Sequence, residues 1–203
     1  GVSTVTCPTI TIDHPDSTTW PKVVTIDFGS TNCTNTAGVN HRGQIIATFS
    51  GPYRAIGTVI TITFNNYYVN DNHVEGTKTI TNDGTNALGQ MFWTVVVQNA
   101  QITKTDGTVI TWNATRVRTW VSGQNTVGNW TDDAYQITGS SAGTNSNGNS
   151  YTSIITSPLY IAWGCRWVEA GTIEVTPSGK PSRTIDFGTA GNCDNDATVT
   201  ING

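Results

Sequence analysis

The chain has few charged residues for its length. Charged side chains make up 12% of the 203 residues, about half of the ~25% that is usual in globular proteins. The formal net charge is −4, and Lys and Arg nowhere form a cluster. A basic surface is the electrostatic requirement for binding a phosphate backbone. The sequence therefore predicts no nucleic-acid partner.

Long apolar runs and catalytic motifs are also missing. No stretch approaches the ~20 apolar residues of a membrane-spanning helix, so we expect no membrane span, and a lipid anchor stays an open question. The sequence has no nucleophile-elbow, His-Glu-x-x-His or Cys-x-x-Cys spacing. His14, His41 and His73 lie far apart in polar segments. We therefore predict no enzyme, no cofactor and three solvated histidines.

Thr, Asn, Gly and Ser are abundant instead, and apolar residues alternate with them. Ile60, Ile62 and Phe64 alternate with threonine and asparagine, which is the period of a strand. We predict an all-β fold of about 13 short strands, arranged as an antiparallel sandwich or an extended twisted sheet. Asn82-Asp83-Gly84 is predicted as a turn, and residues 139–150 as the tip of a hairpin. The other expected strands include 8–13, 22–28, 44–50, 74–81, 90–98, 108–112, 115–121, 135–138, 151–156, 159–163 and 197–202.

One unit of sequence occurs twice. Thr25-Ile26-Asp27-Phe28-Gly29 recurs at residues 184–188, and Asn-Cys follows each copy. Four cysteines allow three pairings. The duplication favours Cys7–Cys33 and Cys165–Cys193, because a hairpin brings its two ends to disulfide distance. Reduced, buried cysteines are the alternative. Two disulfides would indicate an oxidising compartment.

The duplication also organises the chain. We expect one β domain over 1–203, with repeat units at 7–50 and 165–203 and a central β region at 51–164 that is a separate sheet or an insertion. Asp27 and Asp186 occupy equivalent positions in the two units. Paired carboxylates suggest glycoside hydrolysis. Because both copies have the residue, we favour the simpler interpretation that each Asp points outward or caps the following turn.

Four runs of the sequence carry a family resemblance. They are Ile26-Asp27-Phe28-Gly29 with Asn32-Cys33, Gly57 to Tyr67, Val74 to Thr79 and Cys193 to Val199. These runs resemble an uncharacterised family of secreted or lipoprotein-type β-rich proteins of Bacteroidota. The resemblance implies export and a cell-surface location, and it implies no activity. Members of the family often continue past the final Asn-Gly with another strand, whereas this sequence stops at Gly203, so that strand is absent, trimmed or supplied by a neighbouring subunit. The Gly1 start agrees with removal of a signal peptide, although a cleaved tag would look the same.

Two acidic segments offer oxygen ligands to calcium. They contain Asp71 and the pair Asp194 and Asp196. Calcium takes six to eight oxygens, and neither segment continues into the Gly and Glu of an EF-hand. Asx turns explain both segments without a metal, so we predict no bound metal, with calcium as the alternative. Ser17 and Thr18 follow Asp16 and match an O-glycosylation signal of Bacteroidota.

The sequence supports two functions of different kinds. The first is a non-enzymatic extracellular structural protein, a filament or sheath subunit that joins copies of itself by β-strand addition. The terminal segments Gly1 to Thr6 and Ala197 to Gly203 are rich in Thr and Val and almost uncharged. The alternative is a cell-surface carbohydrate-binding module, since flat aromatic rings stack on sugars. Its candidate contacts are Trp130, Tyr67 and Tyr68, and core packing is the alternative role for most of the aromatic residues. Trp130 lies in a polar loop and is the best candidate for an exposed contact.

Overall fold

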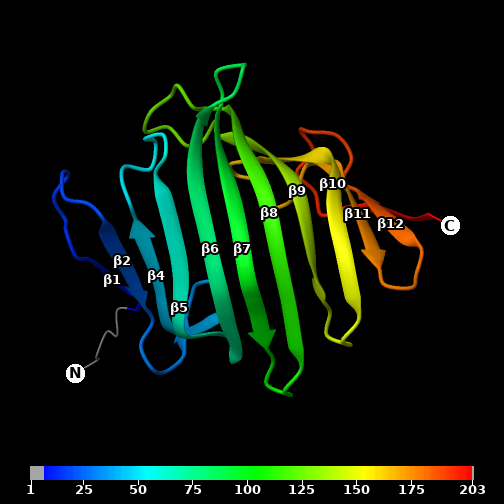
Figure 1. The fold of residues 1–203 in the computed structure, drawn as a ribbon, viewed down its shortest axis with the longest axis horizontal. Coiled ribbons are helices and arrows are strands. Elements are labelled where there is room, and N and C mark those ends of the chain that lie inside the picture. The colour runs from blue at the N-terminus through cyan, green and yellow to red at the C-terminus, as the bar shows by residue number, and fades with distance from the viewer. Residues whose placement is uncertain (1–6, 203) are drawn as a thin grey trace.

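The computed structural model describes residues 7–202, and its thirteen strands form one antiparallel sheet (Figure 1). The terminal segment Gly1 to Thr6 lies outside this range. None of the described residues belongs to a helix, so none forms a helix that could cross a membrane. The strands are β1 (Thr9–Ile12), β2 (Lys22–Asp27), β3 (Cys33–Thr34), β4 (Asn40–Phe49), β5 (Val59–Val69), β6 (Asn72–Thr85), β7 (Met91–Thr103), β8 (Val109–Ser122), β9 (Ala134–Thr144), β10 (Ser150–Ala162), β11 (Ala170–Pro177), β12 (Ser182–Asp186) and β13 (Thr198–Asn202).

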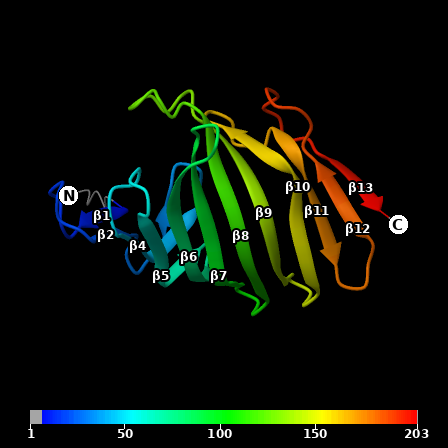
Figure 2. The same ribbon diagram turned by 45° about the horizontal axis from the view of Figure 1, so that its top comes forward.

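Strand order in the sheet follows chain order. Twelve strands form a continuous meander from β1 to β13, and the short β3 pairs with the first residues of β4 beside the end of β2. The sheet is therefore the extended twisted form of the prediction, and its strands rotate progressively from one end to the other (Figures 1 and 2). Because an even number of strands alternates in direction, the two edge strands β1 and β13 run antiparallel to each other.

The structure excludes one of the two alternatives for the central region 51–164. This region is not a separate sheet, because its strands belong to the same sheet as the two repeat units. Several predicted strand boundaries were wrong. Segments 108–112 and 115–121 are one strand of 14 residues, and 151–156 and 159–163 are also one strand. The predicted hairpin tip starts late, because residues 139–144 complete β9. His41 and His73 lie in strands β4 and β6 and not in loops.

The predicted turn at Asn82-Asp83-Gly84 is a β-bulge inside β6. Asn82 pairs with Trp93 and Gly84 with Phe92, so Asp83 is the extra residue. The Asp83 carboxylate accepts the Thr94 N–H at 2.7 Å, which replaces a missing ladder bond. Asx and Gly residues suit a bulge for the same reasons that they suit a turn. The residues Asn82-Asp83-Gly84 correctly indicated an irregular backbone, but the predicted geometry, a turn, was wrong.

A second set of bulges crosses neighbouring strands near their other ends. Gly43, Asn66, Gly76 and Asn99 lie on β4 to β7, and all have positive φ. The register of each strand pair shifts there. A Cβ at Gly43 would lie 1.9 Å from the carbonyl oxygen of Asn66, so only glycine fits. Bulges increase local twist, which bends the sheet at this level.

The two faces of the sheet differ in chemistry because side chains alternate along each strand. We call the first face the apolar face. It is identified by one row of residues that pair with one another across the sheet, one from each strand of the meander: Ile12, Val24, Ala47, Ile62, Lys78, Val97, Ala114, Ser141, Ser153, Val175, Arg183 and Ile201. The second, here the hydroxyl face, has the neighbouring row Thr48, Thr61, Thr79, Val96, Thr115, Ser140, Ile154, Glu174, Thr184 and Thr200.

Charge is divided between the faces. By the same register, the apolar face has the cations Lys22, Lys78, Arg116, Arg118 and Arg183. The hydroxyl face has the carboxylates Asp27, Glu174 and Asp186. Among the described residues it has one cation, Arg42, which lies over Tyr68 and pairs with Asp71. Burial and the nearby Arg118 charge lower the pKa of Lys78. The long aliphatic stems of Lys and Arg cover part of an apolar surface that no second layer of the described residues covers.

The tightest packing lies where the β4–β5 loop folds over the apolar face. Tyr53 of this loop stacks on Trp93 with ring centroids 5.2 Å apart. Trp93 is only 1% exposed, and Trp120 packs beside it. Asn82, equally buried, donates to the Tyr53 carbonyl at 3.1 Å and accepts the Gly84 N–H at 2.8 Å. This small core replaces the second layer that most sheets have.

We predict that Trp93→Ala lowers the free energy of unfolding by about 3–5 kcal/mol, because it leaves a cavity in this core. Leu88→Ala is the control, since Leu88 is 81% exposed in the β6–β7 turn and should change stability by less than about 0.5 kcal/mol. Urea denaturation followed by circular dichroism measures both. Equal effects of the two variants would show that the core does not lie at Trp93.

Candidate functional site

Both edges of the sheet are open in the described chain. β1 pairs only with β2, and β13 pairs only with β12. All residues of both strands are exposed, and their apolar-face side chains include Ile10 at 61% and Ile201 at 64%. Exposed edges normally contain Lys, Pro or a bulge that blocks pairing. β1 (Thr-Ile-Thr-Ile) and β13 (Thr-Val-Thr-Ile-Asn) contain none of these.

The duplicated units show what each edge lacks. Ile10 pairs with Ile26 in the first unit as Ile173 pairs with Ile185 in the second, so β1 corresponds to β11. β11 has a second neighbour, β10, and β1 has none among the described strands. β13 likewise occupies the place of β4, which has β5 as its second neighbour. Each edge strand therefore has an internal counterpart that is paired on both sides.

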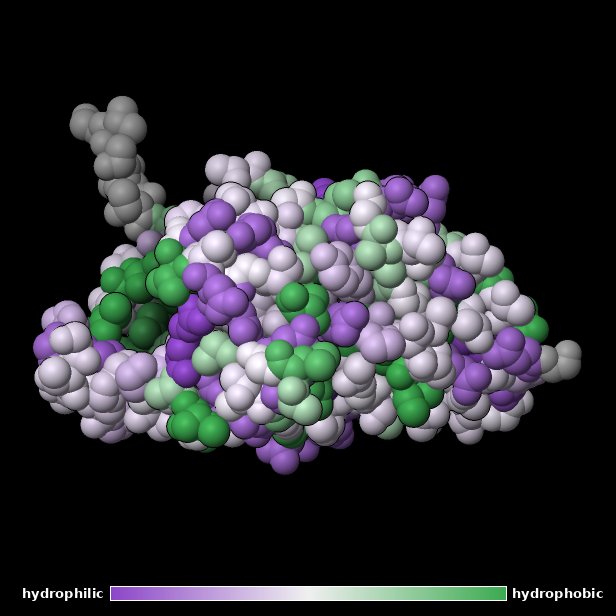
Figure 3. All heavy atoms as spheres, turned by 90° about the horizontal axis from the view of Figure 1, so that it is seen from above, coloured by the Kyte–Doolittle hydropathy of each residue, from purple (hydrophilic) through white to green (hydrophobic). Residues whose placement is uncertain are grey.

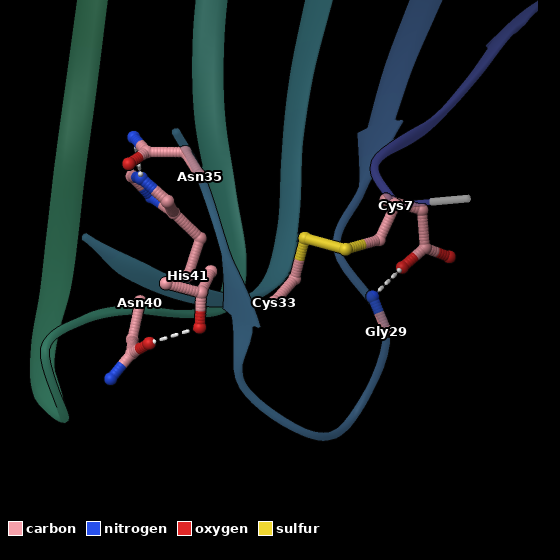
Figure 4. The surroundings of a disulfide bond; sticks show 8 residues. Cys7, Gly29, Cys33, Asn35, Asn40 and His41 are labelled. Atoms are coloured by element: carbon pink, nitrogen blue, oxygen red, sulfur yellow. Dashed lines mark hydrogen bonds between the residues drawn. A yellow bond between two sulfur atoms is a disulfide. The ribbon is translucent and has the colours of Figure 1, made fainter. Parts of the chain in front are cut away.

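The two predicted disulfides are confirmed, and each lies at one edge. Cys7 bonds to Cys33, and Cys165 bonds to Cys193. Figure 4 shows the first bridge joining the segment before β1 to β3, close to the Gly29 turn. The loops that they close span 26 and 28 residues, which corresponds to about 3.5 kcal/mol each in the chain-entropy model. They constrain the polypeptide next to each open edge strand.

The equivalent aspartates cap turns. Asp27 accepts the Gly29 N–H at 2.7 Å, and Asp186 accepts the Gly188 N–H at 2.8 Å. They lie near opposite edges of the sheet and cannot act as a carboxylate pair. Asp27 also accepts the Gln44 side-chain amide at 2.8 Å. This bond, followed by the Gly29 N–H, lowers the pKa of Asp27.

A lowered pKa makes the Asp27 contribution to stability depend on pH. The contribution is fully present above the unfolded value of 3.8 and is lost as the pH falls through the folded value. We predict that Asp27→Asn lowers the melting temperature at about pH 6 and that the difference from the wild type shrinks as the pH falls to about 2. Calorimetry across this range measures it. A difference independent of pH would assign the effect of Asp27 to packing.

The two tyrosines among the predicted ligand contacts differ in burial. Tyr67 is 6% exposed, stacks on Phe64 and contacts the His41 ring nitrogen through its hydroxyl at 2.9 Å, so its prediction as a ligand contact was wrong. Tyr68 is half-buried, with Arg42 over its ring and His73 stacked on it. Its role as a ligand contact stays a prediction. Trp130 is exposed, as expected.

The candidate residues for calcium binding and glycosylation form hydrogen bonds or ion pairs with neighbouring residues. Asp71 pairs with Arg42 and Asn32, and Asp194 accepts the Asp196 N–H at 3.0 Å. Within residues 7–202, no group of three or more side chains is arranged to hold a metal ion. Ser17 and Thr18 lie in the exposed β1–β2 loop, where the Asp16 carboxylate accepts both the N–H and the hydroxyl of Thr18.

A cluster of exposed tryptophans lies between two loops. Trp130 of the β8–β9 loop is 58% exposed, and Trp163 and Trp167 of the β10–β11 loop are 59% and 40% exposed. The other four tryptophans of the chain are buried or half-buried. Trp130 meets Trp163 edge-on at 6.3 Å, and Arg166 lies over Trp167 at 4.7 Å. In Figure 3, hydrophobic residues reach the surface at several places along the molecule.

Trp163 and Trp167 line a hollow of ≈ 270 Å³ beside the second disulfide. Tyr135, Asp133, Arg166 and Cys165 also line it. Asp133 accepts the Trp120 indole N–H at 3.2 Å and the Tyr135 hydroxyl at 3.3 Å. Burial, with Asp133 adding to it, raises the pKa of Tyr135 to about 12, so this tyrosine is a neutral donor. The hollow thus combines aromatic walls with one carboxylate and one guanidinium.

Sequence reasoning had found only Trp130 in this cluster. The available signal was the density of tryptophan around a cysteine in Trp163-Gly164-Cys165-Arg166-Trp167. The β8–β9 and β10–β11 loops are brought together by the pairing of β9 with β10, where Ala162 lies opposite Ala134. Long-range proximity of this kind is not visible in a local pattern.

Comparison with known proteins gives no relative. No family model matches the chain, and neither a curated protein nor a solved structure matches it significantly.

Proposed function

We propose that this protein is a non-enzymatic structural subunit that assembles by β-strand addition, with β13 of one copy pairing with β1 of the next. The observation that carries the proposal is the pair of open, uncharged edge strands on one continuous sheet. Every strand of the meander between β1 and β13 already pairs with a neighbour on each side, and the contact between β13 and β1 would continue this antiparallel pairing. The product would be a filament whose sheet runs through all its subunits.

The directions and faces of the two edges are compatible. Because β1 and β13 run antiparallel, a copy shifted along the sheet without reversal would place β13 against β1 in the antiparallel sense. The register that pairs all of β1 sets Val199 opposite Ile12, Thr200 opposite Thr11 and Ile201 opposite Ile10. Apolar-face residues then meet apolar-face residues, and threonine meets threonine. No charged side chain belongs to either of these strands.

The charge on the apolar face favours growth at the edges over stacking of sheets. Two copies that met through their apolar faces would bring the cations Lys78, Arg116 and Arg118 of one copy towards those of the other. Like charges brought out of water repel strongly. Arg116 Nη1 and Arg118 Nε are buried without a hydrogen-bond partner in the described chain. The edges have no such obstacle.

The chain exposes more surface than a compact monomer does. Its accessible surface is 11756 Å², whereas a compact monomer of 21.7 kDa exposes about 9,200 Å². A single sheet whose two faces are uncovered in the described chain accounts for an excess of this kind.

The two disulfides support a proposal about where the protein is located. Two disulfides form and persist in oxidising compartments. They support an extracellular or cell-surface location for the assembly, as the resemblance to secreted Bacteroidota proteins also implies. Treatment of intact cells with a membrane-impermeant biotin reagent tests this, because a surface subunit is labelled without lysis and an internal one is not.

The assembly is tested by changing one edge. We predict that the wild type forms concentration-dependent oligomers or filaments, and that Ile201→Lys weakens association at least about tenfold, because the lysine puts a charge into the apolar row at the junction. Light scattering coupled to size-exclusion chromatography measures mass, and negative-stain electron microscopy shows filaments.

The matched control is Val127→Lys, which adds the same charge at a loop residue that is 84% exposed. It should assemble like the wild type. A wild type that stays monomeric at its highest soluble concentration would refute the proposal. So would an Ile201→Lys variant that assembles as readily as Val127→Lys.

A further inference from the structure

We propose that the hollow at Trp163 and Trp167 is a carbohydrate-binding site that takes a neutral, pyranose-containing glycan. The site lies in the β8–β9 and β10–β11 loops, and none of its residues belongs to an edge strand. The proposal therefore stands independently of the assembly. It places the predicted carbohydrate-binding activity at residues that the sequence alone had not indicated.

The exposed aromatic surface is the first argument. Trp163 and Trp167 line the hollow, and Trp130 packs edge-on against Trp163 and extends the aromatic surface. Tryptophan is a large residue that proteins cover wherever packing allows, and an exposed cluster of apolar side chains marks a binding surface. A flat indole ring matches the C–H face of a pyranose, which is apolar although its rim bears hydroxyls.

The polar groups are the second argument. Asp133 and Arg166 both line the hollow. Each Asp133 oxygen already accepts one bond, from Trp120 or Tyr135, and a carboxylate oxygen has room for a second donor. A guanidinium only donates hydrogen bonds. Sugar hydroxyls both donate and accept, so one acceptor and one donor beside an aromatic wall suit a sugar rim.

The balance of charge narrows the class of ligand. Arg166 is the one cation that lines the hollow, and Asp133 faces the same space. Arg118 lies over the ring of the lining Tyr135 at 5.1 Å, and the Asp132 carboxylate accepts the Thr126 hydroxyl at 2.9 Å. A uronic or sulfated glycan would bring its own negative charge beside the Asp133 carboxylate. A nucleic acid would need a positively charged groove along its backbone. Neutral sugars meet neither obstacle.

The volume of the hollow indicates that it binds one part of a longer glycan chain. The volume of ≈ 270 Å³ lies just below the ~300–1,000 Å³ of pockets that enclose drug-sized ligands. Such a hollow holds one or two rings and leaves the rest of the glycan outside. Weak binding per site is then expected, and an assembly that repeats the site would strengthen it by multivalency.

The site is held in place before a ligand arrives. The Trp163 N–H donates to the Asp133 carbonyl at 2.8 Å, and the Asp133 N–H donates to the Trp130 carbonyl at 3.2 Å, which ties the two loops together. Gly123 allows this approach, because a Cβ there would lie 2.2 Å from Asp133 Oδ1. The Cys165–Cys193 disulfide holds the second loop. Pre-organised walls lose little entropy on binding.

The test uses soluble hexasaccharides of glucose, xylose, mannose and galactose in several linkages as neutral probes, with alginate and heparin hexasaccharides as acidic probes. Isothermal titration calorimetry measures binding to the full chain with the Ile201→Lys change, so that assembly does not affect the result. We expect at least one neutral probe to bind with a dissociation constant of about 1 mM or tighter. Trp163→Ala and Trp167→Ala should each weaken it at least about tenfold.

Trp163→Phe keeps a ring and should retain most of the binding, whereas Val127→Ala, in the β8–β9 loop, should leave it unchanged. Circular dichroism confirms that each variant is folded. The absence of binding by every neutral probe, binding that survives both alanine changes, or binding by the acidic probes alone would overturn the proposal. Because the assay uses an edge-blocked chain, none of these results bears on strand addition.

Discussion

The structure depends on one unbroken ladder of antiparallel backbone hydrogen bonds. In the described chain this ladder runs from β1 to β13 in a single sheet, and no second sheet or helix covers either face. A sheet of this kind cannot rely on a thick core. Its buried side chains are few, and the two most enclosed, Trp93 and Asn82, lie where the β4–β5 loop folds over one face. Backbone pairing, local side-chain rows and two disulfides hold the rest. An open end of such a ladder is the most consequential surface of the molecule, because the interaction that builds the interior is unfinished there.

The duplicated units explain why both ends are open in the same way. Each unit supplies a hairpin closed by a disulfide, with an Asp that caps the turn before Gly29 or Gly188. In the first unit β4 goes on to pair with β5, and in the second β11 pairs back with β10. The outer strands β1 and β13 correspond to these paired strands but have one partner each in the described chain. The concentration of cations on the apolar face, among them Lys78, Arg116 and Arg118, adds a reason why copies should meet at edges and not through that face.

The fold class and the disulfides could be predicted because both depend on local signals. Alternation at Ile60, Ile62 and Phe64 identifies a strand wherever the strand lies in the fold, and the repeated Asp-Phe-Gly identifies the pairing of the cysteines. Strand continuity could not be predicted, because Asn113 looks like a break in β8 but accepts the Asn99 N–H at 2.7 Å to complete a bulge in β7. The burial of Tyr67 could not be predicted, because it depends on contacts with Phe64 of the same strand and with Phe28 and His41 of the first repeat unit. The tryptophan site depends on two loops that meet through the pairing of β9 and β10, and its recognition required the register of the sheet.

The central claim is that the ladder continues from one copy to the next through β13 and β1. Hydrogen–deuterium exchange of assembled protein, compared with the Ile201→Lys monomer, tests it most directly, because paired amides exchange slowly and open ones quickly. The account predicts that Thr9–Ile12 and Thr198–Asn202 gain at least about tenfold protection on assembly, while the interior strands β6 to β8 change little. Assembly that leaves the exchange of both edge strands unchanged, or that protects a face of the sheet instead, would contradict it.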